Sequence, residues 1–416
     1  MNVGPSTPDH GDRRTVAVVV AVQAAISLGY FAAMTHLVVH LRDDLGLAAG
    51  LIGLVLALRN LVQHTLSLPV GVLVDALNPV RTGILACLLR AAGFALLGTV
   101  TSVPGVVVAA VLLGTGGALF HPAAQSLLAG LSERRRARGY AAYAMTLQVA
   151  AVLGPALGLA LLKVGYWLVA LTAAGLWVFA AFLFSLVRRV PPAPAGDGVA
   201  PSAPAAHGVV SGVRTVLRDR IFMWFAAVSM PTMLLADQAA VVVPLAGADA
   251  QAVTVFSCVL AMVSAAVQPW CAIAGRGERP GVLRAGMLCA GGGYLLLAMG
   301  VGDGTTGLVA VAVLHGLSGG LLQPAVFQTV ARLAPPTRYG AYLGVRAFFS
   351  GLLAFAGGVA VGRLFGWGPH GATTALIALG LVAFAAAAAS YVLPKQRTGA
   401  QDKQPQNEAL RTGATR

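Results

Sequence analysis

Two charged residues stand inside long apolar stretches, Arg59 in LIGLVLALRNLVQHTLSLPV and Asp237 in MPTMLLADQAAVVVP. Burial favours the neutral form of a lone carboxylic acid, whereas a nearby arginine favours the ionised form, so a change of partner switches the proton. The two residues lie at similar depths from the ends of their stretches, so they could bind and release a proton as a pair in a fold that brings the two stretches together. The alternative is that Arg59 bonds to carbonyls in its own half, with Arg90 as a neighbour in a static polar cluster.

A charge at such a position needs other helices around it. The 416 residues are 57% hydrophobic and 10% charged, and the mean hydropathy of +0.80 lies outside the range of soluble globular chains. About 20 helical residues cross the roughly 30 Å hydrocarbon core of a bilayer. The run from Gly50 to Val72 therefore predicts one membrane helix, with Asp75 and Arg81 in its exit loop. The fold class expected is an all-α membrane protein.

Apolar segments of membrane-spanning length follow one another along the chain, six before and six after a stretch rich in proline, alanine and glycine. They are predicted at 15–37, 50–72, 82–100, 104–128, 140–162, 166–187, 221–245, 251–274, 282–301, 306–331, 340–362 and 371–393. The first is longer than a signal-peptide core, so we expect it to be retained.

This count divides the chain into five parts. We expect a cytoplasmic tail over 1–14, a six-helix bundle over 15–187, a cytoplasmic linker over 188–220, a second six-helix bundle over 221–393 and a cytoplasmic tail over 394–416. The later part of the linker alternates valine with arginine, which suits a short helix on the inner membrane surface.

The distribution of Lys and Arg tests the orientation. With both termini in the cytoplasm, only Arg42, Lys163 and Arg363 of the 28 Lys and Arg fall in outer loops. This bias is what the positive-inside rule requires. It also explains the net charge of +14 by attraction to anionic lipid headgroups, without nucleic acid as a partner.

The two halves repeat each other. The stretch GTGGALFHPAAQSLLAGLSERRRARGYAAY, from Gly114 to Tyr143, is echoed by GLSGGLLQPAVFQTVARLAPPTRYGAYLG, from Gly316 to Gly344. Each runs from a glycine cluster through a proline to an arginine, glycine and tyrosine turn. Six-helix halves repeated in parallel are the construction of major facilitator transporters, in which the substrate site lies between the halves near mid-membrane.

Five stretches carry a closer resemblance: LALRNLVQ, LLRAAGF, GALFHP, VLRDRIF and GAYLG. With them the chain resembles the major facilitator superfamily, drug:proton antiporter type, and is similar in detail to MdtH-type multidrug efflux proteins. The resemblance implies the major facilitator fold, with twelve transmembrane helices in two six-helix bundles related by pseudo-two-fold symmetry. In that fold helices 2 and 7 approach each other on the outer side, so Arg59 and Asp237 are expected to form an outer gate that couples transport to protons.

The resemblance also implies an inner gate after helix 2. The family motif GxLxDRxGRR appears here as GVLVDALNPVR, from Gly71 to Arg81, without the basic residue after Asp75 and without the later glycine. Arg136 or Arg138 could supply the missing positive charge, or Asp75 simply ends a helix at the headgroups. Arg346 either pairs with Asp75 or extends to the headgroups.

Helix 5 carries part of the antiporter motif GxxxGPxxGG as Gly154, Pro155 and Gly158. Small residues let helices approach closely and proline kinks them, so this segment is expected to form the seam on which the halves rock. Ordinary helix packing is the competing interpretation. The arginine that the family usually has before the glycines of helix 4 is absent before Gly114, which removes a proton relay through it.

The cavity residues that the resemblance implies mix adaptable apolar groups with amides, as suits loosely specified organic molecules. They are Tyr30, Met34, Gln63, Phe120, Gln125, Met230, Met233, Gln323 and Phe327.

No cofactor or metal site is expected. Cys87, Cys258, Cys271 and Cys289 all lie in apolar runs, which suits packing rather than a disulfide or a metal. His36 and His40 have the spacing of a metal pair, but their place near the end of the first segment favours histidines at the lipid headgroups.

The function expected is secondary active transport in the cell membrane, as proton-coupled export of amphipathic drugs or organic metabolites by alternating access. The partners are a small organic substrate, protons and membrane lipids, and a monomer is expected. An importer or uniporter of a small metabolite is the alternative, because direction cannot be read from a sequence. A polytopic enzyme is a distant one, since neither clustered carboxylates nor a large extramembrane domain is present.

Overall fold

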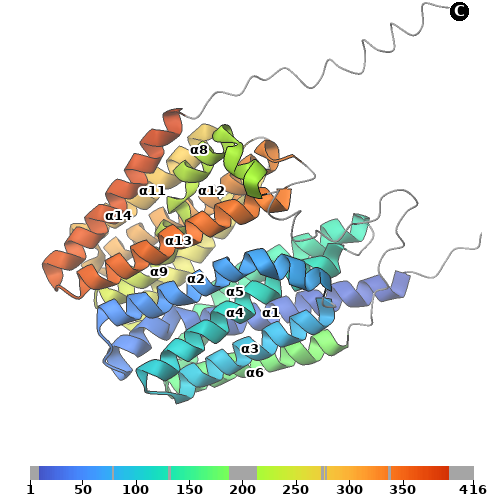
Figure 1. The fold of residues 1–416 in the computed structure, drawn as a ribbon. Helices are drawn as coiled ribbons and strands as arrows, with labels where there is room; N and C mark the ends of the chain where they lie inside the picture. The colour runs from blue at the N-terminus through green and yellow to red at the C-terminus, as the bar shows by residue number, and fades with distance from the viewer. Residues whose placement is uncertain are drawn as a thin grey trace, which may run out of the picture.

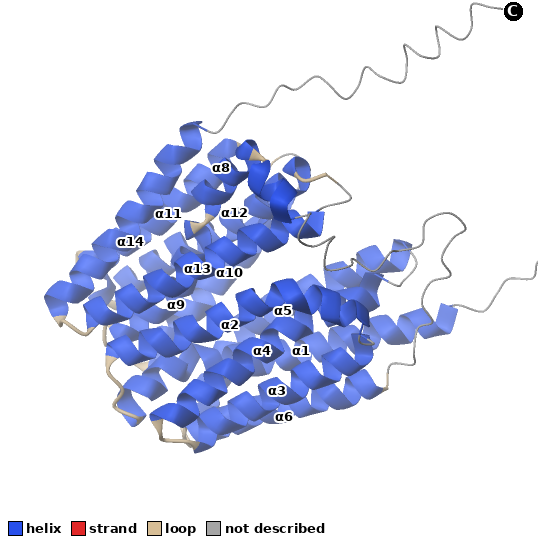
Figure 2. Ribbon diagram, in the orientation of Figure 1, coloured by secondary structure: helices blue, strands red, loops and turns tan. Residues whose placement is uncertain are grey.

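The computed structural model describes residues 9–76, 79–129, 133–186, 213–272, 276, 279–335 and 339–392. Within these ranges the chain is helical apart from short connections and contains no strand (Figure 2). Twelve helical spans in the same ranges are long and apolar enough to cross a membrane. The all-α class and the number of spans agree with the prediction.

The first half is an arrangement of six helices around one apolar core. They are α1 (Asp9–Val39), which continues as a short π-helix, η1 (His40–Asp44), then α2 (Ala49–Ala76), α3 (Pro79–Thr99), α4 (Val103–Ala129), α5 (Glu133–Leu162) and α6 (Tyr166–Ser185). Phe94, Trp177 and Phe184 are almost fully buried in this core.

The second half repeats the plan around its own core. Its helices are α8 (Arg220–Ser229), α9 (Pro231–Leu245), α10 (Ala250–Ala272), α11 (Pro280–Ala298), α12 (Thr305–Leu333), α13 (Tyr339–Phe365) and α14 (Pro369–Ala389), with short 3-10 turns η2 (Val301–Asp303) and η4 (Ser390–Val392). Phe222, Phe256 and Tyr294 are buried here.

The seventh span is broken in the middle, where α8 ends and α9 begins. Pro231 occupies the first position of α9, and a proline has no N–H to continue the hydrogen-bond ladder of the preceding turn. Asp219 caps the start of α8 by accepting a hydrogen bond from the backbone N–H of Phe222 at 3.0 Å. The break sets the direction of α9, which carries Asp237.

The halves meet along two seams, α2 against α13 and α5 against α10 (Figure 1). At the end of the first seam where α2 begins, the backbones nearly touch: a Cβ added to Gly53 would lie 2.9 Å from both the Gly358 oxygen and the Gly362 Cα. Only glycine permits an approach this close. By the internal repeat α2 corresponds to α10 and α5 to α13, so the two seams are equivalent to each other, as the pseudo-two-fold relation predicts.

Some helix ends differ from the predicted ones. Asp75 lies within α2 rather than in its exit loop, and Arg81 lies in the first turn of α3. At the start of α5 the arginine-rich segment is helical from Glu133, because arginine, glutamate and alanine are good helix formers. Of the predicted tails, residues 1–8 and 394–416 lie outside the described residues, and residues 9–14 belong to α1 instead of a tail. Most of the predicted linker also lies outside the described residues. A helical turn over 213–218 precedes α8, where a short helix was predicted.

Candidate functional site

A cavity of about 430 Å³ lies between the two halves. Helices α1, α2 and α5 form one wall, and α9, α10, α12 and α13 form the other. Six of the residues singled out from the sequence line this one cavity: Tyr30, Met34, Arg59, Pro155, Asp237 and Gln323. Asp237 is the single acidic residue among those that line it.

Asp237 reaches the first half through Asn60. The Asn60 Nδ2 donates a hydrogen bond of 2.7 Å to Asp237 Oδ2. Arg59 in turn donates from Nη2 to Asn60 Oδ1 at 2.5 Å and from Nη1 to the Tyr30 hydroxyl at 3.0 Å. The structure thus brings Arg59 and Asp237 together, with the Asn60 amide placed between guanidinium and carboxylate. Asn60 was not predicted from the sequence, although it directly follows Arg59 inside an apolar run.

Arg90 belongs to the polar cluster of the first half. Its guanidinium carbon lies 5.0 Å from the ring centroid of Trp177 and 5.3 Å from that of Tyr30, and Nη2 donates to the Gln63 side-chain oxygen at 3.2 Å. The residue is 6% exposed. Gln63, predicted to line the cavity, instead joins Arg90 in this cluster, and Tyr30 connects the cluster to Arg59.

A second cavity of about 560 Å³ adjoins the first, and the two share Ala236, Leu260, Ser264 and Gln323. It lies mainly among the helices of the second half, with His64 of α2 also in its wall. The predicted cavity residues Met233 and Phe327 line it. So does Arg346, which donates from Nη2 to the Thr232 hydroxyl at 3.0 Å and from Nε to the Ser229 hydroxyl at 3.3 Å.

Other predicted cavity residues lie elsewhere. Phe120 is 2% exposed and meets Trp177 and Phe184 edge to face, with ring centroids 5.6 and 6.1 Å apart. The prediction that it lines the cavity is therefore wrong: its face of α4 points into the apolar core of the first half. Met230 lies at the break between α8 and α9. The Gln125 side chain lies outside the described residues.

The helix 5 motif packs against α1. A Cβ added to Gly154 would lie 2.5 Å from the Phe31 Cβ, and the ring of His36 bonds through Nε2 to the Pro155 carbonyl at 3.0 Å. His36 is fully buried, so its expected place among lipid headgroups is wrong. His40 stacks on Tyr166 with ring centroids 4.0 Å apart.

The inner gate motif can be placed only in part. Gly71 and Asp75 lie in the last turns of α2, and Arg136 and Arg138 lie in the first turns of α5, but their side chains are outside the described residues. Arg81 is exposed at the start of α3. The pairing of Asp75 with a basic residue stays a prediction.

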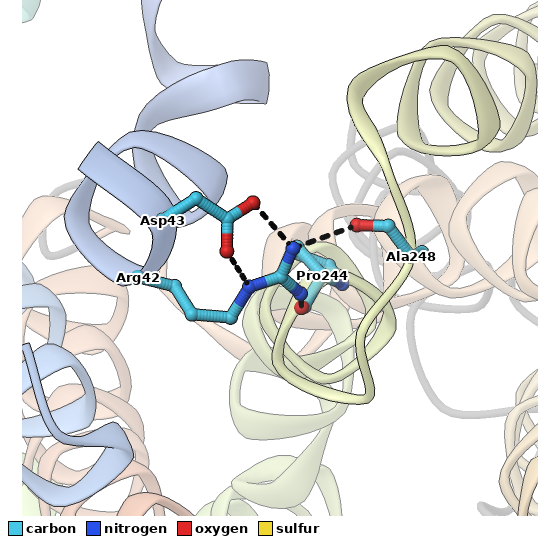
Figure 3. A network of polar contacts seen from close by, with 4 residues as sticks. All are labelled: Arg42, Asp43, Pro244 and Ala248. Carbon is cyan, nitrogen blue, oxygen red and sulfur yellow. Dashed lines mark hydrogen bonds and ion pairs between the residues drawn. The ribbon is translucent and has the colours of Figure 1, made fainter. Parts of the chain in front are cut away.

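A further contact crosses between the halves where η1 meets the end of α9 (Figure 3). Arg42 of η1 donates from Nη1 to the Pro244 carbonyl and from Nη2 to the Ala248 carbonyl at 3.3 Å. Asp43 orients the guanidinium through contacts of 2.5 and 2.6 Å. Carbonyls at the C-terminal end of α9 carry partial negative charge. From the sequence, Arg42 was predicted only to be a charge in an outer loop.

Neutral amides join the halves toward the opposite end of the cavity. The Gln148 side chain of α5 donates to the Gln268 oxygen of α10. Gln268 then donates to Ser264 and to Gln323, each at 3.5 Å. Neither Gln148 nor Gln268 is among the residues that the sequence predicted to form the site.

Twelve spans in two bundles around a shared cavity define a membrane transporter, and the Major Facilitator Superfamily profile matches residues 19–276. The chain belongs to this superfamily. Its relatives include the multidrug resistance protein MdtH of Aeromonas hydrophila, 30% identical over 81% of this chain and 84% of the relative. Another is an MFS-type transporter of Mycobacterium tuberculosis, 28% identical over 85% and 86% of the two chains.

Solved transporters share the fold. The nucleoside transporter NupG superposes with a TM-score of 0.75 at 12% identity, over 92% of this chain and all of its own. A peptide transporter of the POT family gives 0.74 at 16% identity, over 90% and 93%. The relatives and the fold neighbours are transporters rather than enzymes, as expected.

Proposed function

We propose that this protein exports amphipathic organic compounds across the cell membrane in exchange for protons. Both termini then face the cytoplasm, and the end of the molecule that carries Arg42 faces outward. The observation that carries the proposal is the contact between Asn60 and Asp237, which places a carboxylate of one half in the central cavity and joins it to the other half.

Asp237 is the proposed proton carrier. An ionised carboxylate accepts hydrogen bonds about twice as strongly as a neutral acceptor. Loss of the proton from Asp237 therefore strengthens the hydrogen bond from Asn60 and favours the conformation in which the two halves are in contact at this level. Uptake of a proton weakens the same bond and favours separation of the halves at this level. In this scheme Arg59 acts through Asn60, holding the amide with its oxygen toward the guanidinium.

Closure of the outer side rests on two further features of the seams. The glycine contact between α2 and α13 and the Arg42 contact to the α9 carbonyls both join the halves near the outer helix ends. Opening outward requires both to separate, and the amide contact between Gln148 and Gln268 lies toward the other end of the cavity. Separation at one end with contact at the other is the movement that alternating access needs.

Proteoliposomes that hold the purified protein test the proposal. With an imposed proton gradient, dye movement against its own gradient should occur in the wild type and stop when the gradient is collapsed. Asp237→Asn should abolish gradient-driven movement while dye binding remains measurable. Asp303→Asn, a matched change at an exposed acid on η2, should behave as the wild type.

Two results would contradict the proposal. Gradient-driven movement in Asp237→Asn at the wild-type rate would remove Asp237 as the proton carrier. Movement in the direction of the proton flow, rather than against it, would make the protein an importer. The orientation is checked separately by labelling a cysteine introduced at Asp43 with a reagent that does not cross the membrane.

A further inference from the structure

We infer that the second cavity is an anion subsite, in which Arg346 binds the carboxylate or another acidic group of the transported compound. The inference rests on the proposed function, because it names the substrate class of that transporter: amphipathic organic anions rather than organic cations.

Arg346 has only uncharged partners among the described residues. Its hydrogen bonds go to the hydroxyls of Ser229 and Thr232, and no carboxylate of the described residues lies within ion-pair distance of it. A guanidinium has five N–H donors in a planar fork, so two hydroxyl bonds leave donors to spare. A charge placed among apolar helices without an opposite charge is costly. An anionic group that enters the cavity offsets this cost.

The chemistry of the cavity wall supports an acidic ligand. Its lining residues include Arg346, His64, Ser318 and Gln323 and no aspartate or glutamate. Each of these four side chains can donate a hydrogen bond. In the adjoining cavity the charge of Asp237 is already balanced by Arg59, which approaches it through Asn60. The charged side chains that line the two connected cavities therefore sum to a positive value.

The remaining wall suits the apolar body of such a compound. Leu322, Val326, Phe327 and Leu343 line the same cavity, and its volume of about 560 Å³ is in the usual range for sites that bind small organic molecules. Gln323 and Ser264 belong to both cavities, so a ligand with its acidic group at Arg346 extends from there toward Asp237.

Two dyes with the same ring system test the inference. Fluorescein is an anion and rhodamine 123 is a cation, and both have a xanthene skeleton. Their binding to the purified protein in nanodiscs is followed by fluorescence anisotropy, with gluconate as the only other anion. Arg346→Gln should weaken fluorescein binding by roughly ten- to a hundredfold, which is the loss expected for hydrogen bonds to a charged group. Rhodamine 123 binding should change by less than about twofold, the level expected when no such bond is lost.

Two matched variants test whether a loss of fluorescein binding is specific to the Arg346 side chain. Arg346→Lys keeps the charge and should lose less fluorescein affinity than Arg346→Gln. Arg284→Gln removes another guanidinium bonded to a serine hydroxyl, at 3.0 Å, which lies outside both cavities, and it should bind fluorescein as the wild type does. The ratio of the two dye affinities within each variant corrects for partial unfolding.

The inference is overturned if wild-type fluorescein binding is undetectable, if Arg346→Gln leaves it unchanged, or if both dyes lose affinity equally. A replacement of gluconate by chloride forms a further arm. If chloride stabilises the wild type and not Arg346→Gln while fluorescein does not bind, the site takes an inorganic anion instead. Dye binding is measured at equilibrium and depends neither on a proton gradient nor on the direction of transport. The binding result therefore tests the anion subsite even if proton-coupled export is disproved.

Discussion

Asn60 of α2 donates a hydrogen bond of 2.7 Å to the Asp237 carboxylate of α9 and so joins the two halves inside the central cavity. Because Asn60 also accepts a bond from Arg59 at 2.5 Å, its amide is fixed with the donor toward the carboxylate. Arg59 and Asp237 are thus connected across the halves through Asn60 and without a direct ion pair. Of the two, only the aspartate can lose its charge by taking up a proton, so the strength of the link depends on the charge of Asp237.

The first prediction concerns this link. Asn60→Ala removes a hydrogen bond to a charged group, worth about 1.5–3 kcal/mol, so the outward-open fraction should rise roughly ten- to a hundredfold. The measurement is the labelling rate of Ala49→Cys by an impermeant maleimide, in a background where the four native cysteines are replaced.

Thr115→Val is the control for Asn60→Ala, since the Thr115 hydroxyl bonds only to the Val111 carbonyl of its own helix. It should label at the wild-type rate. If Asn60→Ala labels no faster than this control, the contact does not hold the halves together.

A second prediction concerns Arg42. Arg42→Gln should also raise labelling at position 49, because it removes the contacts to the Pro244 and Ala248 carbonyls. The side chain is 23% exposed, so the effect should shrink in about 1 M salt, where charges are screened within about 3 Å. Lys163→Gln, another outer-loop cation, should have no effect. An effect of Arg42→Gln that is independent of salt would show that packing, and not charge, is what it changes.

The third prediction concerns the close glycine contact between α2 and α13. Gly53→Leu should prevent closure of the outer side, because even its Cβ would lie 2.9 Å from Gly358 and Gly362 backbone atoms. Transport should fall to background while the protein still folds, and position 49 should label continuously. Gly175→Leu on α6 introduces the same side chain where no atom lies within 4 Å. Normal transport by Gly53→Leu would mean that this approach is not needed.

The fourth prediction separates structural from coupling arginines. Arg90→Lys should lower the free energy of unfolding by about 1–3 kcal/mol, because lysine replaces neither the stacking on Trp177 and Tyr30 nor the fork geometry. Thermal unfolding in detergent measures this, with the exposed Arg81→Lys as control. Proton coupling in the folded fraction should persist. If Arg90→Lys abolished proton coupling without changing the stability, Arg90 would have a role in proton coupling and not only a structural one.

Much of the fold could be predicted from the sequence because a bilayer leaves few options for the backbone. Helices of fixed length and the bias of Lys and Arg determine the number of spans. The break before Pro231 was missed, since the apolar run continues through it. The extension of α1 into a π-helix was missed too, because hydropathy does not distinguish helix types.

The site was predicted less completely. Asp237 and Arg59 stood out as charges in apolar runs, and the structure brings them to one cavity. Asn60 did not, because an uncharged amide beside an arginine carries no comparable signal. Phe120 was misplaced because which face of a helix meets the cavity depends on tertiary packing, and α4 is apolar all round.

The amide contact between Gln148 and Gln268 has a consequence of its own. Glutamine carries no net charge at any physiological pH, so neither voltage nor acidity acts on this contact directly. The Arg42 guanidinium keeps its charge at every physiological pH, so the contact that it makes responds to voltage alone, whereas the Asp237 carboxylate can also take up a proton. In the proposed mechanism the ion gradient therefore acts on one end of the crevice alone, and the opposite end follows only through the rigid helices between them.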